Sequence, residues 1–539
     1  MSLERRMLLA LVATCLFLFS FQIGNHDFWD PDEPRYAGVT RNILENDEWI
    51  RLTDNGEPYT HKPPLFFWIL AVAARVGGGL SETTARIPSG LAGLLCVVAV
   101  YRLGQRLFNS RVGWLSAMTM ATSQRFFLES RWVHMDTLLT LFVVLAMESA
   151  YTALQGNRRS WIWMYGWMAL GCLAKGPFGV VLPAAGVLVA LASTGEVSRL
   201  KRSGWFWGVP LSLLPVAVWL YTSSRFSGVD PGSVVDRQVF QRLQEGVHHP
   251  RPFTYYLYSL PLEFLPWTLF LPSVFRFTFP ATQRRERGSL LFVYGWVVGQ
   301  LCLLSLVAEK RPSYLLPLFP ALALLVGCFF DGYLTRFDVS EMRRWVEWPI
   351  ALGGLGCLAG SLWLADRGMQ YPGLRERIMP LGLFLGVACV GALWLQRRGR
   401  RGAVILTLIA ATASAYLWIV GAIYPWLNTY KSARPFSERI LSRIGESPLG
   451  VYGDYLPSVA YYTHRRLQVV RTPGGLEALV RGSDGAFCVV PKERVSALQA
   501  TLPLQVTDAA SIGHQSYALV GMGPSTRDKL KSQPGESPR

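Results

Sequence analysis

Apolar runs long enough to cross a lipid bilayer recur along this sequence, and they restrict the fold more than any other feature. A helix needs roughly 20 apolar residues to span about 30 Å of hydrocarbon, and runs of about 18 to 22 residues follow one another here. Hydrophobic residues make up 51% of the 539 positions, which is too many for a soluble globular protein. Because spanning helices satisfy their own backbone hydrogen bonds in lipid, the sequence predicts an all-α polytopic membrane protein with about 13 transmembrane helices.

The net charge of +17 gathers in short connections between these runs, which indicates membrane topology and argues against a nucleic-acid partner. We place the N-terminal basic residues in the cytoplasm and let the spans alternate. The basic connections then all fall on the inner side: Arg102/Arg106/Arg111, Arg158/Arg159, Arg199/Lys201/Arg202, Arg284/Arg285/Arg287, Arg336/Arg343/Arg344 and Arg397/Arg398/Arg400/Arg401. The candidate functional residues therefore lie on the outer side.

Composition divides the chain into three parts. Residues 1–425 are predicted to form the transmembrane domain, with a first outer loop over residues 24–86. After residue 425, the short β-like runs LGVYGDY, LQVVR, AFCVV and SYALVGM alternate with helix-compatible stretches, which predicts a small α/β domain over residues 426–525 on the outer side. Residues 526–539 are polar and predicted to be disordered.

The first outer loop is strongly acidic, and its motif Asp30-Pro31-Asp32-Glu33-Pro34-Arg35-Tyr36 carries candidate chemistry. A carboxylate here could take a proton from an acceptor hydroxyl or hold a metal, with Arg35 and Tyr36 one turn further along the predicted helix 34–46. The competing interpretation is that Asp32 or Glu33 only caps that helix.

A second motif, Tyr59-Thr60-His61-Lys62-Pro63-Pro64, precedes an apolar run that is too short to span and is predicted to lie at the membrane interface. The Lys62 ammonium suits a phosphate oxygen at the membrane surface. Snorkelling of this side chain towards lipid head groups explains the motif equally well.

Two charged residues, Asp136 and Lys175, fall at the outer ends of predicted spans, where an unpartnered charge costs a few kcal/mol. They either pair with each other or line an outward-opening cavity together with Arg131 and His134.

Two further outer segments contain candidate ligands. The loop Gln244–Tyr258 offers His249 as a metal ligand and Arg251 as a phosphate contact. The corner from Glu309 to Tyr314 is charged and precedes a proline-broken span, which predicts a helix bordering a cavity. A metal site becomes possible if His61 joins His249 and a carboxylate.

Taken in order, these motifs resemble the GT-C class of polyprenyl-phosphate-sugar glycosyltransferases, in the branch of the bacterial lipid A aminoarabinose transferases and the protein O-mannosyltransferase superfamily. The resemblance covers roughly residues 20 to 330 and depends on five segments: PDEPRYA, HKPP, MDTLLT with AKG, HHPRPFTYY and RPSYLLPLFPALALL.

The resemblance implies an inverting glycosyltransferase in the bacterial inner membrane, with its active site and C-terminal domain facing the periplasm. It implies a polyprenyl-phosphate-sugar donor lipid, a glycolipid or protein acceptor such as lipid A, and no nucleotide. The implied roles are a catalytic carboxylate at Asp32, donor contacts, and a divalent metal, zinc or magnesium, near His249. The sequence itself adds His61 as a candidate second metal ligand. The residues implied to bind substrate are Arg35, Tyr36, Lys62, Asp136, Lys175 and Tyr314. The loop sequence adds Arg251 as a candidate phosphate contact. This chain departs from the aminoarabinose branch at His61, where those enzymes carry Glu, so the sugar, acceptor and metal set stay open.

Two other classes compete with this interpretation. A transporter or flippase of lipid-linked glycans would distribute charges through the bilayer depth and show two related halves, whereas the charges here cluster at one face. A structural scaffold that presents the C-terminal domain would leave the costly Asp136 and Lys175 unexplained.

Overall fold

The computed structural model describes residues 2–241, 250–280, 287–335, 339–368, 371–482 and 485–522, and the chain divides into two compact units. The first unit contains the N-terminal residues to Ile23, Trp49–Arg51 and Thr60–Ile423. The second contains Gly24–Glu48, Leu52–Tyr59 and the described residues from Tyr424 onward. Most of the first outer loop therefore belongs to the same compact unit as the C-terminal part of the chain.

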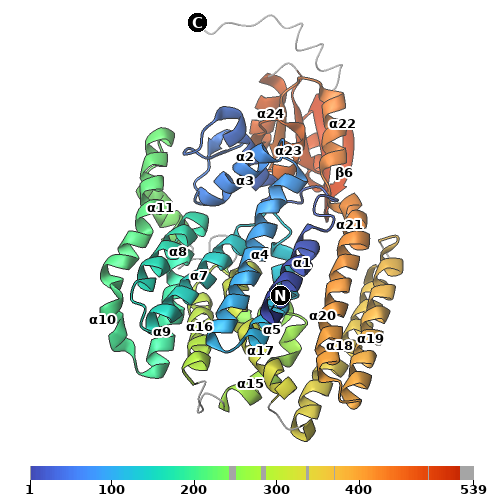
Figure 1. Cartoon of the computed structure of the whole chain (residues 1–539). Coiled ribbons are helices and arrows are strands. Elements are labelled where there is room, and N and C mark those ends of the chain that lie inside the picture. Colours follow the sequence, from blue (N-terminus) through green and yellow to red (C-terminus); the bar gives the residue numbers. More distant parts are fainter. Residues whose placement is uncertain are drawn as a thin grey trace, which may run out of the picture. The chain divides into compact units, whose positions relative to one another are not determined.

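The first unit is helical throughout, and its long helices run side by side (Figure 1). Its principal α-helices are α1 (Leu3–Ser20), α3 (Leu65–Val76), α4 (Glu82–Leu107), α5 (Ser110–Ala121), α6 (Gln124–Glu129), α7 (Asp136–Leu154), α8 (Ser160–Lys175), α9 (Phe178–Thr194), α10 (Leu200–Ser203), α11 (Trp205–Ser227), α12 (Pro231–Val235), α14 (Tyr255–Glu263), α15 (Leu271–Thr278), α16 (Arg287–Leu306), α17 (Phe319–Thr335), α18 (Val339–Arg367), α19 (Leu374–Arg397) and α20 (Arg401–Trp418). Helix α7 packs along α8, α9 along α16, α5 along α17 and α18 along α19.

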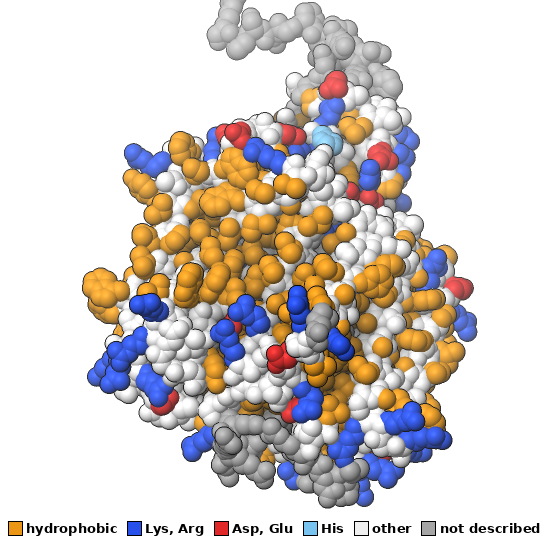
Figure 2. All heavy atoms as spheres, viewed as in Figure 1, with side chains coloured by type: hydrophobic (Ala, Val, Ile, Leu, Met, Phe, Trp, Pro, Cys, Tyr) orange, Lys and Arg blue, Asp and Glu red, His pale blue; other side chains and the backbone are white. Residues whose placement is uncertain are grey.

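Eight helices in the described ranges are long and apolar enough to cross a membrane, so the chain is a multi-pass membrane protein. Apolar side chains cover the middle of the first unit, and Lys and Arg side chains gather towards its lower end in the view of Figure 2. The eight candidate spans are Glu82–Leu107, Asp136–Leu154, Trp205–Ser227, Arg287–Leu306, Pro312–Thr335, Met342–Arg367, Leu374–Arg397 and Arg401–Ile444. The total of about 13 spans stays a prediction.

Close helix approaches in the first unit occur at glycines. A Cβ atom built on Gly179 of α9 would lie 2.2 Å from the backbone of Gly171 in α8, and one on Gly104 of α4 would lie 2.6 Å from Gly113 of α5. Small residues let helix backbones approach in membranes, where packing replaces the hydrophobic effect as the force between helices. Between α8 and α9 the chain reverses at Gly176, whose φ of +75° favours glycine.

The second unit contains a five-stranded mixed sheet in the order β4-β3-β5-β7-β6. Strand β3 (Leu449–Tyr452) runs parallel to both β4 (Gln468–Val470) and β5 (Phe487–Pro491), while β7 (Gln515–Met522) pairs antiparallel with β5 and with β6 (Leu504–Ile512). Helices α21 (Tyr424–Lys431), α22 (Arg434–Ile444), α23 (Pro457–Thr463), α24 (Pro473–Gly482) and α25 (Lys492–Gln499) accompany it. The predicted small α/β domain is therefore present.

The first-loop part of the second unit consists of helix α2 (Asp32–Asn46) and a two-stranded hairpin, β1 (Thr53–Asp54) and β2 (Glu57–Pro58). Helix α2 begins two residues before the predicted start at Pro34, because acidic residues are favourable in the first turn of a helix. Helix α2 packs against α23. The predicted disordered tail, residues 526–539, lies outside the described residues.

Candidate functional site

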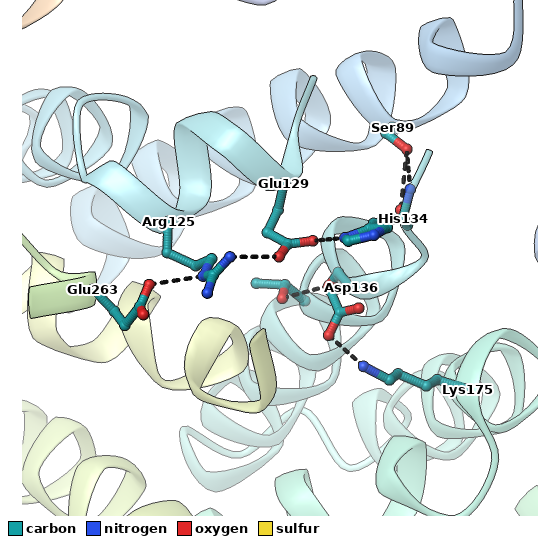
Figure 3. Close-up of polar contacts among 8 residues, drawn as sticks. Ser89, Arg125, Glu129, His134, Asp136, Lys175 and Glu263 are labelled. Atoms are coloured by element: carbon teal, nitrogen blue, oxygen red, sulfur yellow. Dashed lines mark hydrogen bonds and ion pairs between the residues drawn. The ribbon is translucent and has the colours of Figure 1, made fainter. Parts of the chain in front are cut away.

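Asp136 and Lys175 form a buried ion pair between the first residue of α7 and the last residue of α8 (Figure 3). The two residues are only 6% and 8% exposed. The Lys175 ammonium also lies 4.8 Å from the centre of the Tyr314 ring, within reach of a cation–π interaction. Tyr314 itself donates a hydrogen bond of 3.3 Å to Glu309. The predicted pairing is present, and a third predicted residue joins it.

Lys62 and His134 also lie close enough to Asp136 to interact electrostatically with its carboxylate. Five residues that the sequence singled out, from four separate segments of the chain, therefore meet in the first unit: Lys62, His134, Asp136, Lys175 and Tyr314. Two ammonium groups share one carboxylate in this group. Ammonium groups gathered in this way can bind an anionic ligand.

Arg251 lies beside the Glu309–Tyr314 corner. The Arg251 N–H donates to the Ala308 carbonyl at 3.2 Å, and Pro250 pairs with Glu309 as an isolated antiparallel bridge. The Lys310 ammonium in turn donates to the Arg251 carbonyl at 3.2 Å. The backbone around Arg251 is thus fixed to the corner that carries Tyr314.

A line of charged side chains crosses the first unit next to the Asp136–Lys175 pair (Figure 3). Glu263 at the end of α14 accepts from Arg125 at 2.8 Å, and Arg125 lies 3.4 Å from Glu129, one turn further along α6. The other Glu129 oxygen lies 2.6 Å from His134 Nδ1. The Ser89 hydroxyl donates to the His134 carbonyl at 3.0 Å. His134 is therefore held through its ring and its backbone.

Three of these residues could hold a metal ion, because Glu129, His134 and Asp136 offer ligand atoms that lie within 4.8 Å of one another. One imidazole nitrogen with carboxylate oxygens fits zinc, while magnesium prefers an all-oxygen set. Arg125 and Lys175 already pair with the two carboxylates, so a divalent cation would compete with them. Of the predicted metal pair, His61 is exposed and His249 lies outside the described residues.

The acidic first-loop motif lies in the second unit. Asp30 precedes α2, whereas the residues from Asp32 onward lie in its first turns. Asp32 is the first residue of α2 and is half-buried, and Tyr36 is buried one turn later. The Arg35 guanidinium lies 3.5 Å from Asp54 and 5.9 Å from the centre of the Tyr455 ring. Glu33 is buried and accepts a 3.4 Å hydrogen bond from the Trp29 N–H.

Two carboxylates near Asp32 are tied to the C-terminal part of the chain. Asp30 accepts from the Ser458 N–H at 3.1 Å and from the Ser458 hydroxyl, and Asp54 accepts from the Tyr455 hydroxyl at 3.0 Å. Burial raises the pKa of both carboxyl groups, although their hydrogen bonds and the Arg35 charge oppose that shift. Among the motif's acids, Asp30 and Glu33 therefore make contacts that fix the loop, and Asp32 stands at the start of α2.

Comparison with known sequences finds relatives over much of the chain. Residues 61–221 match the dolichyl-phosphate-mannose-protein mannosyltransferase family. The undecaprenyl phosphate-alpha-4-amino-4-deoxy-L-arabinose arabinosyl transferase of Pseudomonas aeruginosa is 29% identical over 407 residues, which cover 73% of this chain and 70% of the relative. An uncharacterized Aquifex aeolicus protein is 24% identical over 90% of this chain and 92% of its own length.

Solved structures extend the likeness to the whole chain. Apo ArnT from Cupriavidus metallidurans superposes with a TM-score of 0.81 at 19% identity, over 97% of this chain and all of that one, 100%. The archaeal oligosaccharyltransferase AglB from Archaeoglobus fulgidus gives a TM-score of 0.51 at 12% identity, over 91% of this chain and 70% of its own. The chain is a membrane glycosyltransferase with the GT-C fold.

Sequence reasoning missed three charged residues of this glycosyltransferase: Arg125, Glu129 and Glu263. Arg125 and Glu129 stand at i,i+4 spacing in a segment flanked by apolar runs. A charge pair at helical spacing inside an apolar context is the signal that could have found these two. Glu263 offers no local signal, because its partner lies 138 residues away in the sequence.

Proposed function

We propose that this membrane glycosyltransferase moves a sugar from a polyprenyl-phosphate donor to a hydroxyl group of an acceptor outside the cytoplasm. Relatives with this function in their names support the donor class: the P. aeruginosa relative is named for undecaprenyl phosphate, and one ArnT structure, with a TM-score of 0.77, is titled as bound to undecaprenyl phosphate. The acceptor we propose is a glycolipid such as lipid A, another envelope glycan or a protein.

The observation that supports the proposal is the convergence of two ammonium groups beside Asp136. Lys175 pairs with this carboxylate, and Lys62 lies close enough to interact with it electrostatically. Ammonium groups form charge-assisted hydrogen bonds with phosphate oxygens, so a donor phosphate beside Lys62 and Lys175 would be stabilised.

The chemical step we propose is an inverting displacement. The acceptor oxygen attacks the anomeric carbon while the bond from that carbon to the phosphate oxygen breaks, and the acceptor proton passes to the Asp32 carboxylate. The departing polyprenyl phosphate gains negative charge. Lys62, Lys175 and Arg251 would stabilise that charge more in the transition state than in the ground state, which accelerates the reaction. The sugar–phosphate bond supplies the driving force, so no nucleotide takes part.

The orientation we propose places the Asp136–Lys175 end of α7 and α8 at the periplasmic side of a bacterial inner membrane. The Lys and Arg residues at the end of α4, near the start of α18 and at the end of α19 then face the cytoplasm, as charge bias requires. A lipid-linked donor could enter such a site laterally, with its tail in the bilayer.

Of the two metals considered, we propose zinc, held by Glu129, His134 and Asp136. When bound, zinc would supply additional positive charge near the donor phosphate. The ion pairs of Arg125 and Lys175 limit its affinity, because the same carboxylates would serve both.

Variants Asp32→Asn and Lys62→Ala test the proposal. Native and variant proteins would be assayed in membranes with a polyprenyl-phosphate sugar and envelope lipid as acceptor. We expect Asp32→Asn to lose most turnover, because the amide cannot take up the acceptor proton. We expect Lys62→Ala to reduce kcat by about 100-fold or more, as is typical when one charge-stabilising donor is removed.

Exposed residues provide matched controls. Glu57→Gln in the same loop and Lys201→Ala after α9 alter charge at exposed positions and should leave turnover unchanged. Normal turnover by both Asp32→Asn and Lys62→Ala would refute the proposed catalytic roles. Movement of the labelled glycan across sealed vesicles without covalent transfer would instead support a transporter.

A further inference from the structure

Residues of the C-terminal α/β part of the chain contact the first-loop motif both before and after Asp32 in the sequence. Asp30 precedes Asp32 by two residues and is bound by Ser458, while Arg35 follows by three residues and is bound through Asp54 and Tyr455. Both contacting residues, Tyr455 and Ser458, come from the short segment that follows strand β3. This relationship joins residues that are 428 positions apart in the sequence.

The contact at Asp30 also completes a helix. Helix α23 begins at Pro457, and its N-cap residue, Leu456, makes no side-chain cap hydrogen bond. The Ser458 N–H belongs to the first turn, where backbone donors have no partner within the helix. The Asp30 carboxylate accepts from that N–H and from the Ser458 hydroxyl, so it takes the place of a cap residue from another part of the chain.

The contact after Asp32 is a triangle of three side chains. Arg35 lies 3.5 Å from Asp54, its guanidinium lies 5.9 Å from the Tyr455 ring centre, and the Tyr455 hydroxyl donates to Asp54 at 3.0 Å. Asp54 and Tyr455 are partly buried, which strengthens each interaction relative to water. The triangle therefore fixes the first turn of α2 at Arg35, which follows Asp32 in the sequence, whereas Asp30 precedes it.

The far end of α2 is held by the same part of the chain. Arg41 donates to the Tyr461 carbonyl at 2.9 Å, pairs with His464 Nδ1 at 2.8 Å, and places its guanidinium 4.0 Å from the Tyr461 ring centre. Burial and the Arg41 charge lower the pKa of His464, which favours the neutral ring that can accept from Arg41. Asn55 exchanges two hydrogen bonds, of 2.8 and 2.7 Å, with the Leu467 backbone.

We propose that Ser458 and Tyr455 are positioning residues for the catalytic carboxylate, so that the C-terminal part of the chain fixes the place of Asp32 during sugar transfer. This inference rests on the proposed role of Asp32. A catalytic base must stay within hydrogen-bond reach of the proton that it removes, and a displacement of about 1 Å can reduce the rate about 100-fold. Neither residue would touch the substrate.

The test compares Ser458→Ala, Tyr455→Phe and their double variant in the full-length protein. Tyr455→Phe removes the hydroxyl and keeps the ring beside Arg35, and Ser458→Ala removes one of the two hydrogen bonds to Asp30. We expect the double variant to lower kcat by about 10- to 100-fold with the donor KM changed less than about twofold. Ser458→Thr keeps the hydroxyl, so its kcat should be close to that of the native protein and not to that of Ser458→Ala.

Two controls distinguish positioning from general loss of stability. Ser511→Ala removes the hydrogen bond to Ser516 in the β6–β7 hairpin and should leave kcat unchanged. Hydrogen–deuterium exchange should show faster exchange of residues 30–36 in the double variant, with β5 and β7 as protected as in the native protein. If the double variant does not accumulate, Tyr455→Phe with its intact ring serves the same comparison.

The outcomes separate the two proposals. A double variant with native kcat, tested beside an inactive Asp32→Asn, would overturn the positioning role and leave the proposed function intact. A fully active Asp32→Asn would overturn both. A kcat decrease that Ser458→Thr does not reverse would also contradict the inference.

Discussion

Lys175 forms an ion pair with Asp136 although the two residues lie on different helices and both are buried. The pair joins the first turn of α7 to the last turn of α8, where the carboxylate and the ammonium each have the sign that the helix dipole favours. Tyr314 covers the ammonium from a third segment. The pair can therefore serve both the packing of the bundle and the binding of an anion, and variants can separate these two roles.

Breaking this pair from one side should destabilise the protein strongly. Lys175→Met leaves a buried carboxylate without its main partner, and we expect a loss of about 3 to 5 kcal/mol in the free energy of unfolding. The double variant Asp136→Asn/Lys175→Met should recover much of that loss and still fail to transfer sugar. Thermal unfolding in detergent and the membrane assay give the two readouts, and recovery of both would show that the pair is only structural.

A more exposed pair on α18 provides the reference for that measurement. Arg343 and Glu347 lie 2.9 Å apart at i,i+4 spacing, with the Arg343 side chain 53% exposed. Arg343→Met should change the unfolding free energy by about 1 kcal/mol or less.

The contact between α9 and α8, the helix that ends at Lys175, leaves no room for a side chain at Gly179. A methyl group there would lie 2.2 Å from the α8 backbone, so Gly179→Ala must push α8 and α9 apart and lower both stability and turnover. Gly166, in the same helix as Lys175, meets nothing within 4 Å, and Gly166→Ala should be neutral or stabilising by up to about 1 kcal/mol. Equal behaviour of the two variants in thermal unfolding would contradict the close contact.

Acid should stabilise the second unit through Asp30. Burial raises the pKa of this carboxyl above its unfolded value, so its contribution to stability is fully present below about pH 4 and is lost as pH rises through the folded pKa. Asp30→Asn stays neutral, and the Ser458 hydroxyl can turn to accept from the amide. We expect this variant to be at least as stable as the native protein at pH 7.5, by exchange protection of α23, with the advantage gone below pH 4.

The stability contribution of Asp508 should depend on pH in the opposite direction to that of Asp30. Burial pushes its pKa upward, but hydrogen bonds from Arg439 and the Ala509 N–H, with the charges of Arg439 and Arg443, outweigh burial and hold the pKa below its usual value. Its contribution is therefore present at neutral pH and lost only as pH falls below about 4. Asp508→Asn should weaken the contact of β6 with α22 at pH 7.5 by about 1 kcal/mol, and a variant that matches the native protein there would contradict this assignment.

Zinc content provides a prediction that does not depend on activity. Protein purified after zinc exposure and analysed by plasma mass spectrometry should hold less metal when Glu129→Gln or His134→Ala removes one of the three ligands. His61→Ala serves as the comparison, since the sequence had assigned the metal to His61 and His249. If only His61→Ala lowered the zinc content, the metal would instead be bound by the ligand set with His61 and His249 that the sequence predicts.

The membrane architecture was predictable because its causes are local. Apolar length predicts the spans, and strand-forming runs predicted β3, β4, β5 and β7 within a few residues. Strand β6 was missed, because its sequence LQVTDAASI contains residues that disfavour strands, and its pairing with β7 alone holds it at the edge of the sheet.

The site was predictable where a charge stands out from an apolar context and not where its partner is remote. Asp136 and Lys175 were recognisable as costly charges, and their pairing was one of the two alternatives considered. The link from Arg125 to Glu263 depends on how α6 and α14 pack, which no local pattern records. Likewise, nothing in the motif around Asp30 indicates that Ser458 would bind it.

The long-range hydrogen bonds between Asp30 and Ser458 have a consequence for biosynthesis. The ribosome releases α2 early, yet the residues that complete its surroundings emerge only after nearly all of the membrane helices have been made. The first loop therefore lacks its partners Ser458 and Tyr455 until translation is almost finished. A nascent chain that stops short of strand β3 would insert its helices and still lack the means to lock its own first loop.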